Sequence, residues 1–93
     1  MEFEWEDYKA DENLQKHGID FLDATCIFLD PHRLDVEDDR EDYGERRFKT
    51  IGRVQDRVIV VVYTYAEQHT RIISARKAEP YERRKYHEGE TGP

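Results

Sequence analysis

A run of β-branched and aromatic residues from Val58 to Tyr65 constrains the fold of this chain most strongly. Such a run is typical of a central strand that is buried on both faces. The alternating segment Arg47–Ile51 and the segment Arg71–Lys77 predict one strand on each side of it. Turn residues at 52–57 and again at 68–70 separate these segments. The pattern predicts a meander of three antiparallel strands.

Helical signals precede the meander. Residues 8–17 follow Asp7, a suitable N-cap, and are followed by Gly18, which suits a helix C-terminus. Asp20 can cap a second, short helix. The apolar and small residues of this helix recur at helical spacing, at Phe21, Ala24, Thr25 and Phe28. We therefore expect two helices before the sheet.

The remaining segments complete an α+β arrangement. Phe3 to Trp5 alternates with glutamates like a short strand, and the acidic stretch 35–45 predicts an exposed loop or a weak edge strand. Pro80 suits the first turn of a C-terminal helix over residues 80–88, which we expect to end at Gly89. We expect a single domain over residues 1–93, in which helices on one side leave the opposite sheet face to a ligand.

Composition excludes several classes of protein. Charged residues make up 40% of the chain and hydrophobic residues 37%, so the core must be small. The longest apolar stretch, Val58–Tyr63, is far shorter than the ~20 residues of a membrane span, and the N-terminus does not resemble a secretory signal. We therefore expect a cytoplasmic protein without membrane contact. One cysteine and four histidines without ligand spacing predict neither a metal site nor a cofactor.

Charge is distributed unevenly along the chain. Residues 1–45 hold 16 acidic residues against four Lys and Arg, a charge of −12, whereas residues 46–93 hold six against eleven, a charge of +5. A positive C-terminal half predicts a face that meets phosphate, and the acidic half predicts a face for a basic partner. On charge alone, an ordinary solvated surface explains the same numbers.

The strongest chemical cluster comes from the last strand and the helix after it. On a regular strand, Ser74 and Arg76 share one face, whereas Arg71 and Lys77 share the other. The helix then adds acid, base and cation side chains at Glu82, Arg83, Tyr86 and His87. Such a set suits metal-independent RNA cleavage, in which a base deprotonates the 2′-hydroxyl and cations stabilise the phosphorane. The alternative is an amphipathic helix whose Glu82 and Tyr86 face the sheet.

Other positions allow two interpretations each. Arg47 and Lys49 share a strand face and either extend a cationic stripe or pair with acidic neighbours. His17, at the end of the first helix, most simply complements the helix dipole, and its alternative role is that of a proton donor. We expect Cys26 to be buried and inert. We expect the core to include Trp5, Phe21 and Phe28.

The sequence resembles the BrnT family of bacterial toxins from BrnT/BrnA toxin-antitoxin pairs. The most specific match is the run Arg71–Ala78 together with Glu82, Arg83 and Tyr86. Further matches lie along nearly the whole chain, at Phe3–Trp5, Lys9, Asn13, Lys16–Phe21, Ala24, Phe28, Asp30–Pro31, Gly44–Phe48, Ile51–Gly52 and Val62–Thr64.

The resemblance implies a RelE-like fold and a ribonuclease that inhibits translation and growth by cleaving RNA. It implies neutralisation by a BrnA-type antitoxin with a ribbon-helix-helix domain, through which alone the complex contacts operator DNA. We assign catalytic roles to Arg47, Arg76, Glu82 and Tyr86, and RNA binding to Lys49 and Arg83. The alternative is a non-catalytic binding module that acts with a DNA-binding partner in operon regulation.

Overall fold

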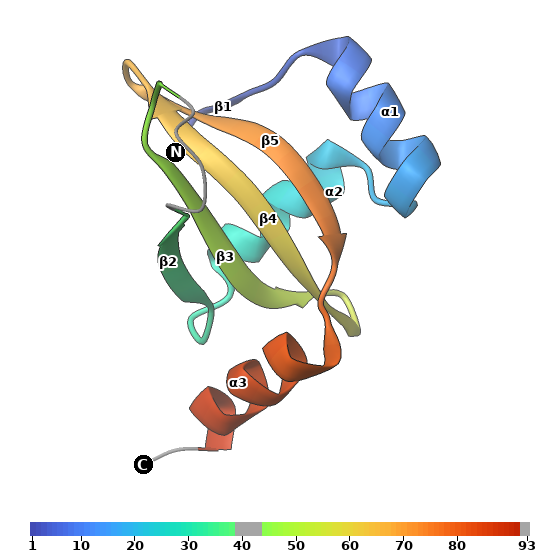
Figure 1. Cartoon of the computed structure of the whole chain (residues 1–93), viewed down its shortest axis with the longest axis vertical. Coiled ribbons are helices and arrows are strands. Elements are labelled where there is room, and N and C mark those ends of the chain that lie inside the picture. Colours follow the sequence, from blue (N-terminus) through green and yellow to red (C-terminus); the bar gives the residue numbers. More distant parts are fainter. Residues whose placement is uncertain (39–43, 92–93) are drawn as a thin grey trace.

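The computed structural model describes residues 1–38 and 44–91, which form one mixed sheet with helices on both faces (Figure 1). The strand order is β1-β5-β4-β3-β2. In chain order the elements are β1 (Phe3–Glu4), α1 (Asp7–His17), α2 (Phe21–Ala24), the 3-10 helix η1 (Thr25–Leu29), β2 (Leu34–Asp38), β3 (Arg47–Val54), β4 (Arg57–Ala66), β5 (His69–Lys77) and α3 (Pro80–Thr91).

The predicted meander is confirmed, because β4 pairs antiparallel with β3 on one side and with β5 on the other. The central residues Val60 and Val61 are fully buried on opposite faces. Burial on both faces does not extend along all of β4, however. Tyr65 is 60% exposed, because β4 continues beyond the helices that cover its middle.

The two edges of the sheet differ from a pure meander. β1 pairs with β5 in parallel, through Phe3 with Thr70 and Glu4 with Arg71, so the sheet is mixed. The acidic stretch predicted as a loop or weak edge strand begins as the edge strand β2, which pairs with β3. Residues 39–43 of that stretch lie outside the described residues.

The helix boundaries follow the predicted signals with two corrections. α1 begins at Asp7, so that Glu6 is the N-cap, and Gly18 after its last residue adopts a left-handed φ of 70°. Asp20 caps α2 by accepting a hydrogen bond from the Leu22 amide at 2.9 Å. The prediction that the last helix ends at Gly89 is wrong. α3 continues to Thr91, and the ion pair of Glu90 with Arg53 stabilises its last residues.

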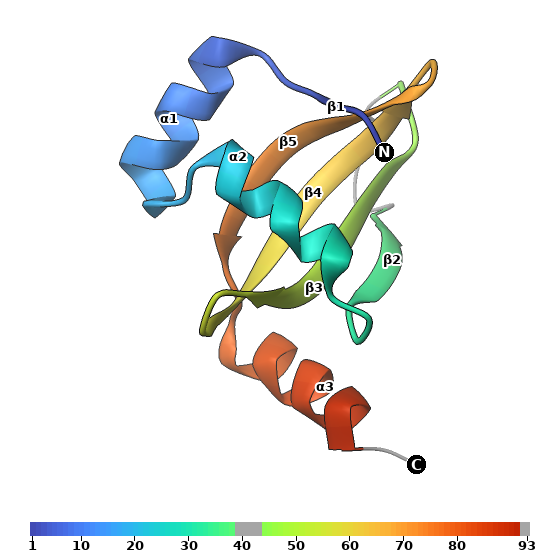
Figure 2. The same ribbon diagram turned by 180° about the vertical axis from the view of Figure 1, so that it is seen from behind.

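The back face of the sheet carries α2 and η1, which lie across its strands (Figure 2). Between these two helices and the sheet lies the main core, which comprises Ile19, Phe21, Ala24, Ile27, Val54, Ile59, Val61, Tyr63, Ile72 and Ala75. Trp5 and Phe28 pack against this core while remaining partly exposed. Gly52 permits the close approach of η1, since a Cβ there would lie 2.6 Å from Ile27 Cγ1. Cys26 is exposed on the outer side of η1, which corrects the expectation that it is buried.

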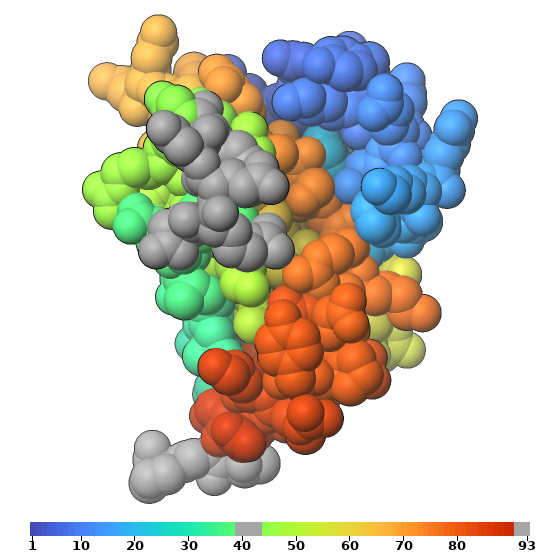
Figure 3. Space-filling model, in the orientation of Figure 1, coloured from blue at the N-terminus to red at the C-terminus, as the bar shows by residue number. Residues whose placement is uncertain are grey.

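The opposite face of the sheet, which we call the front face, is partly covered by α3. This finding corrects the expectation that helices lie on one side of the sheet only. α3 packs over its lower part and buries a second core of Ile51, Val58, Val60, Ala78 and Tyr86. The upper part of this face is bordered by α1 and β5 (Figure 3). In the described ranges, no helix has both the length and the apolar character needed to cross a membrane.

Candidate functional site

A β-bulge decides which cations share the front face. The register between β4 and β5 shifts at Ile73, so Ile72 and Ala75 both enter the main core although they are three residues apart. Their neighbours Arg71 and Arg76 therefore both lie on the front face. The prediction that these two arginines lie on opposite faces is wrong, because the extra residue of a bulge shifts the alternation of side chains.

Asn13 attaches α1 to the edge of β5. Its side-chain amide donates to the carbonyl oxygens of Ala75 at 2.9 Å and Ile19 at 3.0 Å, and its oxygen accepts from the Ala75 amide at 3.0 Å. The buried side chain thus satisfies backbone groups of β5 that an adjacent strand would otherwise pair. This attachment places the inner side of α1 beside the front face.

A cleft of about 270 Å³ lies between α1 and the front face. Its lining comprises Lys9, Glu12, Asn13, Lys16 and His17 from α1, Arg47 from β3, and Ile73 and Ser74 from β5. Three of these side chains are cationic and one is acidic, so the cleft has a positive charge that suits a phosphate. Sequence reasoning missed Lys9, Lys16 and Ser74 as site residues, because α1 and β5 meet only in the folded chain.

The surroundings of His17 in this cleft disfavour its protonated form. Its pKa is lowered from 6.5, first by partial burial and then by the positive charges of Lys16 and Arg76. The imidazole is therefore neutral at pH 7 and can accept a proton. The helix-dipole interpretation predicts a raised pKa, whereas burial and the neighbouring cations lower the pKa of His17.

Arg76 forms a double hydrogen bond with the buried carboxylate of Glu82, at 2.8 and 3.0 Å. The Glu79 amide donates to the same carboxylate at 2.7 Å, and Lys49 Nζ lies 3.7 Å from it. Burial alone raises the pKa of Glu82, but the hydrogen bonds and the two cations lower it overall. Glu82 is therefore a stable anion that holds Arg76 in place, and these contacts favour a structural role over proton transfer.

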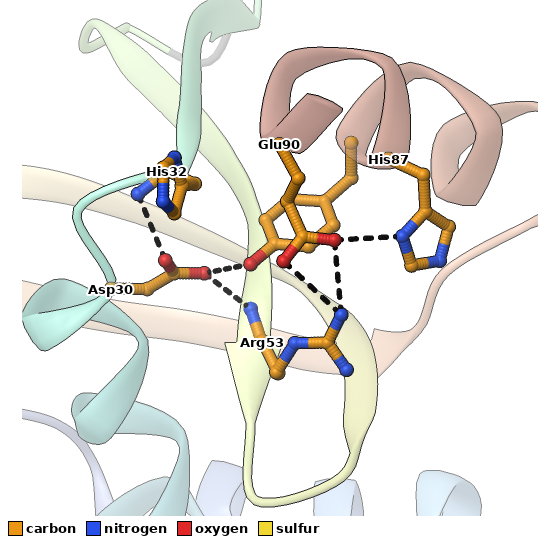
Figure 4. A network of polar contacts seen from close by, with 6 residues as sticks. Asp30, His32, Arg53, His87 and Glu90 are labelled. Carbon is orange, nitrogen blue, oxygen red and sulfur yellow. Dashed lines mark hydrogen bonds and ion pairs between the residues drawn. The ribbon is translucent and has the colours of Figure 1, made fainter. Parts of the chain in front are cut away.

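Tyr86 belongs to a different polar network with Asp30, Arg53 and Glu90. Figure 4 shows the last three of these residues between η1, β3 and the end of α3. The Tyr86 hydroxyl donates to Asp30 Oδ2 at 2.5 Å, and the Arg53 guanidinium lies over its ring at 5.6 Å. Burial and the Asp30 carboxylate raise its pKa to about 12. Glu90 accepts from Arg53 at 3.1 Å and contacts His87 at 2.9 Å, which ties the end of α3 to the sheet.

This network borders a second cavity of about 330 Å³. The cavity is lined by Cys26, Leu29, Asp30, His32, Arg53, Gln55, Tyr86 and Glu90. Two carboxylates face a single guanidinium there, and that guanidinium already binds Glu90. This arrangement suits a phosphate less well than the cleft beside α1.

The structure thus divides the predicted site residues. Arg47, Lys49 and Arg76 share the front face, on which Arg47 lines the cleft and the other two contact Glu82. Tyr86 lies in the second cavity, and Arg83 is exposed on α3, where it donates to the Ala78 carbonyl at 3.1 Å. Within residues 1–38 and 44–91, no group of three or more His, Cys, Asp or Glu side chains is arranged to hold a metal ion.

Comparison with known proteins gives one family. Its model, described as the ribonuclease toxin BrnT of type II toxin-antitoxin systems, matches residues 5–82. The match includes every residue that lines the cleft and ends before Tyr86. Among curated proteins, no match to the chain is found. The family match covers most of the sequence, and the chain belongs to the BrnT family of ribonuclease toxins, which act with an antitoxin partner.

Proposed function

We propose that this chain is a metal-independent endoribonuclease that cleaves RNA in the cleft between α1 and the front face. The observation that carries the proposal is a neutral histidine in a positively charged cleft, with its pKa lowered by burial and by cations. A base that is neutral at pH 7 and cations that bind phosphate are the two requirements of this reaction.

In the proposed reaction, His17 accepts the proton of a 2′-hydroxyl, whose oxygen then bonds to the adjacent phosphorus. Arg47 and Arg76 stabilise the negative charge that develops on the phosphorane. The bond from phosphorus to the 5′-oxygen breaks, and that oxygen takes a proton from solvent or from a lysine ammonium of the cleft. The products are a 2′,3′-cyclic phosphate and a 5′-hydroxyl. Glu82 acts by positioning Arg76, and Lys49 and Arg83 contact the RNA backbone.

The proposed role in the cell is that of a toxin, and it rests on membership of the BrnT family and on the resemblance to BrnT/BrnA pairs. A toxin that cleaves RNA inhibits translation and growth until its antitoxin binds it. We propose that the antitoxin is of the BrnA type with a ribbon-helix-helix domain, and that the complex contacts operator DNA through that domain. The order of two helices, a meander and a last helix supports a RelE-like fold.

The test is incubation of the purified chain with total bacterial RNA in EDTA, followed by electrophoresis and end-group analysis. Wild type should yield fragments with cyclic phosphate ends, and His17→Gln should cleave about 10²–10⁴-fold more slowly. Arg84→Gln, which changes an exposed residue of α3, is the control for loss of a cation and should retain activity. Equal rates for His17→Gln and wild type would exclude His17 as the base.

The same experiment examines the alternative of a non-catalytic binding module. One observation favours that alternative, namely that Glu82 already pairs with two of the cations assigned to RNA. If folded wild type leaves RNA intact, both alone and in a translating extract, the result contradicts cleavage and favours the binding module. Cleavage only in the extract would instead indicate that the ribosome presents the substrate.

A further inference from the structure

The helix formed by α2 and η1 is apolar on two opposite sides. Its inner side carries Phe21, Ala24 and Ile27, all fully buried in the main core. Its outer side carries Leu22 and Leu29, which are 65% and 83% exposed, with the exposed Cys26 between them. A helix on the surface of a domain normally has a polar outer side, and one that is apolar all around is normally buried.

The exposed apolar surface continues beyond this helix. A shallow groove of about 270 Å³ runs beside it, lined by Met1, Phe3, Thr25, Cys26, Phe28 and Leu29. Met1 is 75% exposed and lies on the same side as the helix. We call Met1, Leu22, Cys26 and Leu29 the α2–η1 patch. Contiguous apolar surface with a polar border is typical of protein interaction sites.

The border of the patch is acidic. Glu2, Asp20 and Asp23 are exposed beside Met1 and Leu22 in the sequence, and Asp30 follows Leu29. Arg33 lies over the Phe28 ring at 5.3 Å, but its charge is paired with Asp35 at 2.7 Å. A partner that covers this surface must therefore offer apolar side chains bordered by basic ones. A second copy of the chain would instead place acidic groups against acidic groups.

We propose that the α2–η1 patch binds a basic amphipathic segment of the antitoxin partner. The inference rests on membership of a toxin-antitoxin family and is independent of the cleavage mechanism. Phe48 packs against the main core at the back of the sheet, so its neighbour Arg47 and the cleft lie on the front. Figure 2 shows α2 and η1 on the back face, so partner binding there and RNA cleavage can be measured separately.

Cys26 provides a direct probe, because it is the only cysteine of the chain and lies within the patch. The antitoxin encoded in the same operon is purified and added to the chain, and alkylation of Cys26 by iodoacetamide is followed by mass spectrometry of the intact toxin. At an antitoxin concentration of about ten times Kd, alkylation should slow about tenfold. An unchanged rate at saturating antitoxin would overturn the proposal.

The double variant Leu22→Glu/Leu29→Glu adds two charges to the patch without altering the main core. It should weaken antitoxin binding at least about 30-fold, as expected for hot-spot residues, and leave RNA cleavage by the free toxin unchanged. Leu14→Glu, on the exposed side of α1, is the matched control and should bind as wild type does. Wild-type affinity of the double variant would refute the docking site.

Two further outcomes separate this inference from related hypotheses. Concentration-dependent protection of Cys26 in the chain alone, with a dimer in sedimentation, would assign the patch to self-association and overturn the proposal. Protection of Cys26 by antitoxin, with no RNA cleavage by the chain either alone or in a translating extract, would support the docking site and contradict the proposed function.

Discussion

The guanidinium of Arg76 on β5 and the carboxylate of Glu82 on α3 are joined by two parallel hydrogen bonds across the junction between strand and helix. Glu82 is fully buried, whereas the Arg76 side chain remains 29% exposed. The two residues are six positions apart in sequence, and the Glu79 amide donates a hydrogen bond to the same carboxylate. The pair therefore couples the orientation of α3 to the position of a cation on the front face.

Removal of Arg76 should affect both stability and cleavage. Arg76→Ala leaves the buried Glu82 carboxylate with the Glu79 amide and the more distant Lys49 ammonium. We expect a loss of about 2–3 kcal/mol, below the value for a fully buried pair because Arg76 is partly exposed. The double variant Arg76→Ala/Glu82→Gln should recover much of this stability but none of the cleavage activity. Urea denaturation measures the first effect and RNA cleavage the second. Recovered cleavage in the double variant would limit Arg76 to a structural role.

The pH dependence of cleavage should report His17. Cleavage should rise with pH up to a midpoint below 6.5 and then level off, because the neutral imidazole is the active form. NMR titration of the His17 ring should give the same midpoint, and Arg76→Ala should raise it because a neighbouring positive charge is removed. A midpoint above 6.5 would contradict the assigned environment.

From the lowered pKa of His17 we also predict how the free energy of unfolding depends on pH. The unfolded chain binds a proton near pH 6.5 more readily than the folded chain does, so folding stability contributed by neutral His17 is lost as pH falls below that value. His17→Gln should reduce this part of the pH dependence. Urea unfolding at pH 7.5 and 5.5 measures the difference, with His32→Gln, an exposed residue outside the cleft, as control.

Asn13→Ala should detach α1 from the edge of β5. The substitution removes three hydrogen bonds and leaves backbone groups of Ala75 without these partners, so we expect a loss of about 2–4 kcal/mol. Hydrogen exchange of the Ala75 amide should accelerate more than exchange in the centre of β4. Gln15→Ala, on the exposed side of the same helix, should change neither quantity. Equal effects of both substitutions would indicate that helix propensity alone is responsible.

Tyr86→Phe distinguishes a catalytic role of this residue from a structural role. The substitution removes the hydrogen bond to Asp30 while keeping the buried ring, and we expect a loss of about 1–2 kcal/mol with cleavage within about twofold of wild type. Tyr81→Phe, at a half-exposed position of α3, is the control. If Tyr86→Phe abolishes cleavage and remains folded, the catalytic role that we assigned to Tyr86 from the sequence is correct and the site extends to the second cavity.

The meander could be predicted because its signals are local. The apolar run of β4, the alternation of β3 and the turns between strands are present in consecutive residues. Gly18 and Asp20 likewise mark helix ends through their own backbone and side-chain chemistry. The end of α3 could not be predicted from Gly89, because contacts with Arg53 on β3 extend the helix past that residue.

The candidate site was only partly predictable for the same physical reason. Residue types identified Arg47, Lys49 and Arg76 as cations suited to phosphate, and family resemblance indicated a ribonuclease toxin. The bulge at Ile73 moved Arg71 to the front face, and Asn13 brought His17 beside Arg47 in one cleft. The sequence by itself determined the three strands of the meander, the helix ends at Gly18 and Asp20, and the family. Only the tertiary structure decided which charged side chains meet, because pKa values and cleft linings depend on residues that are distant along the chain.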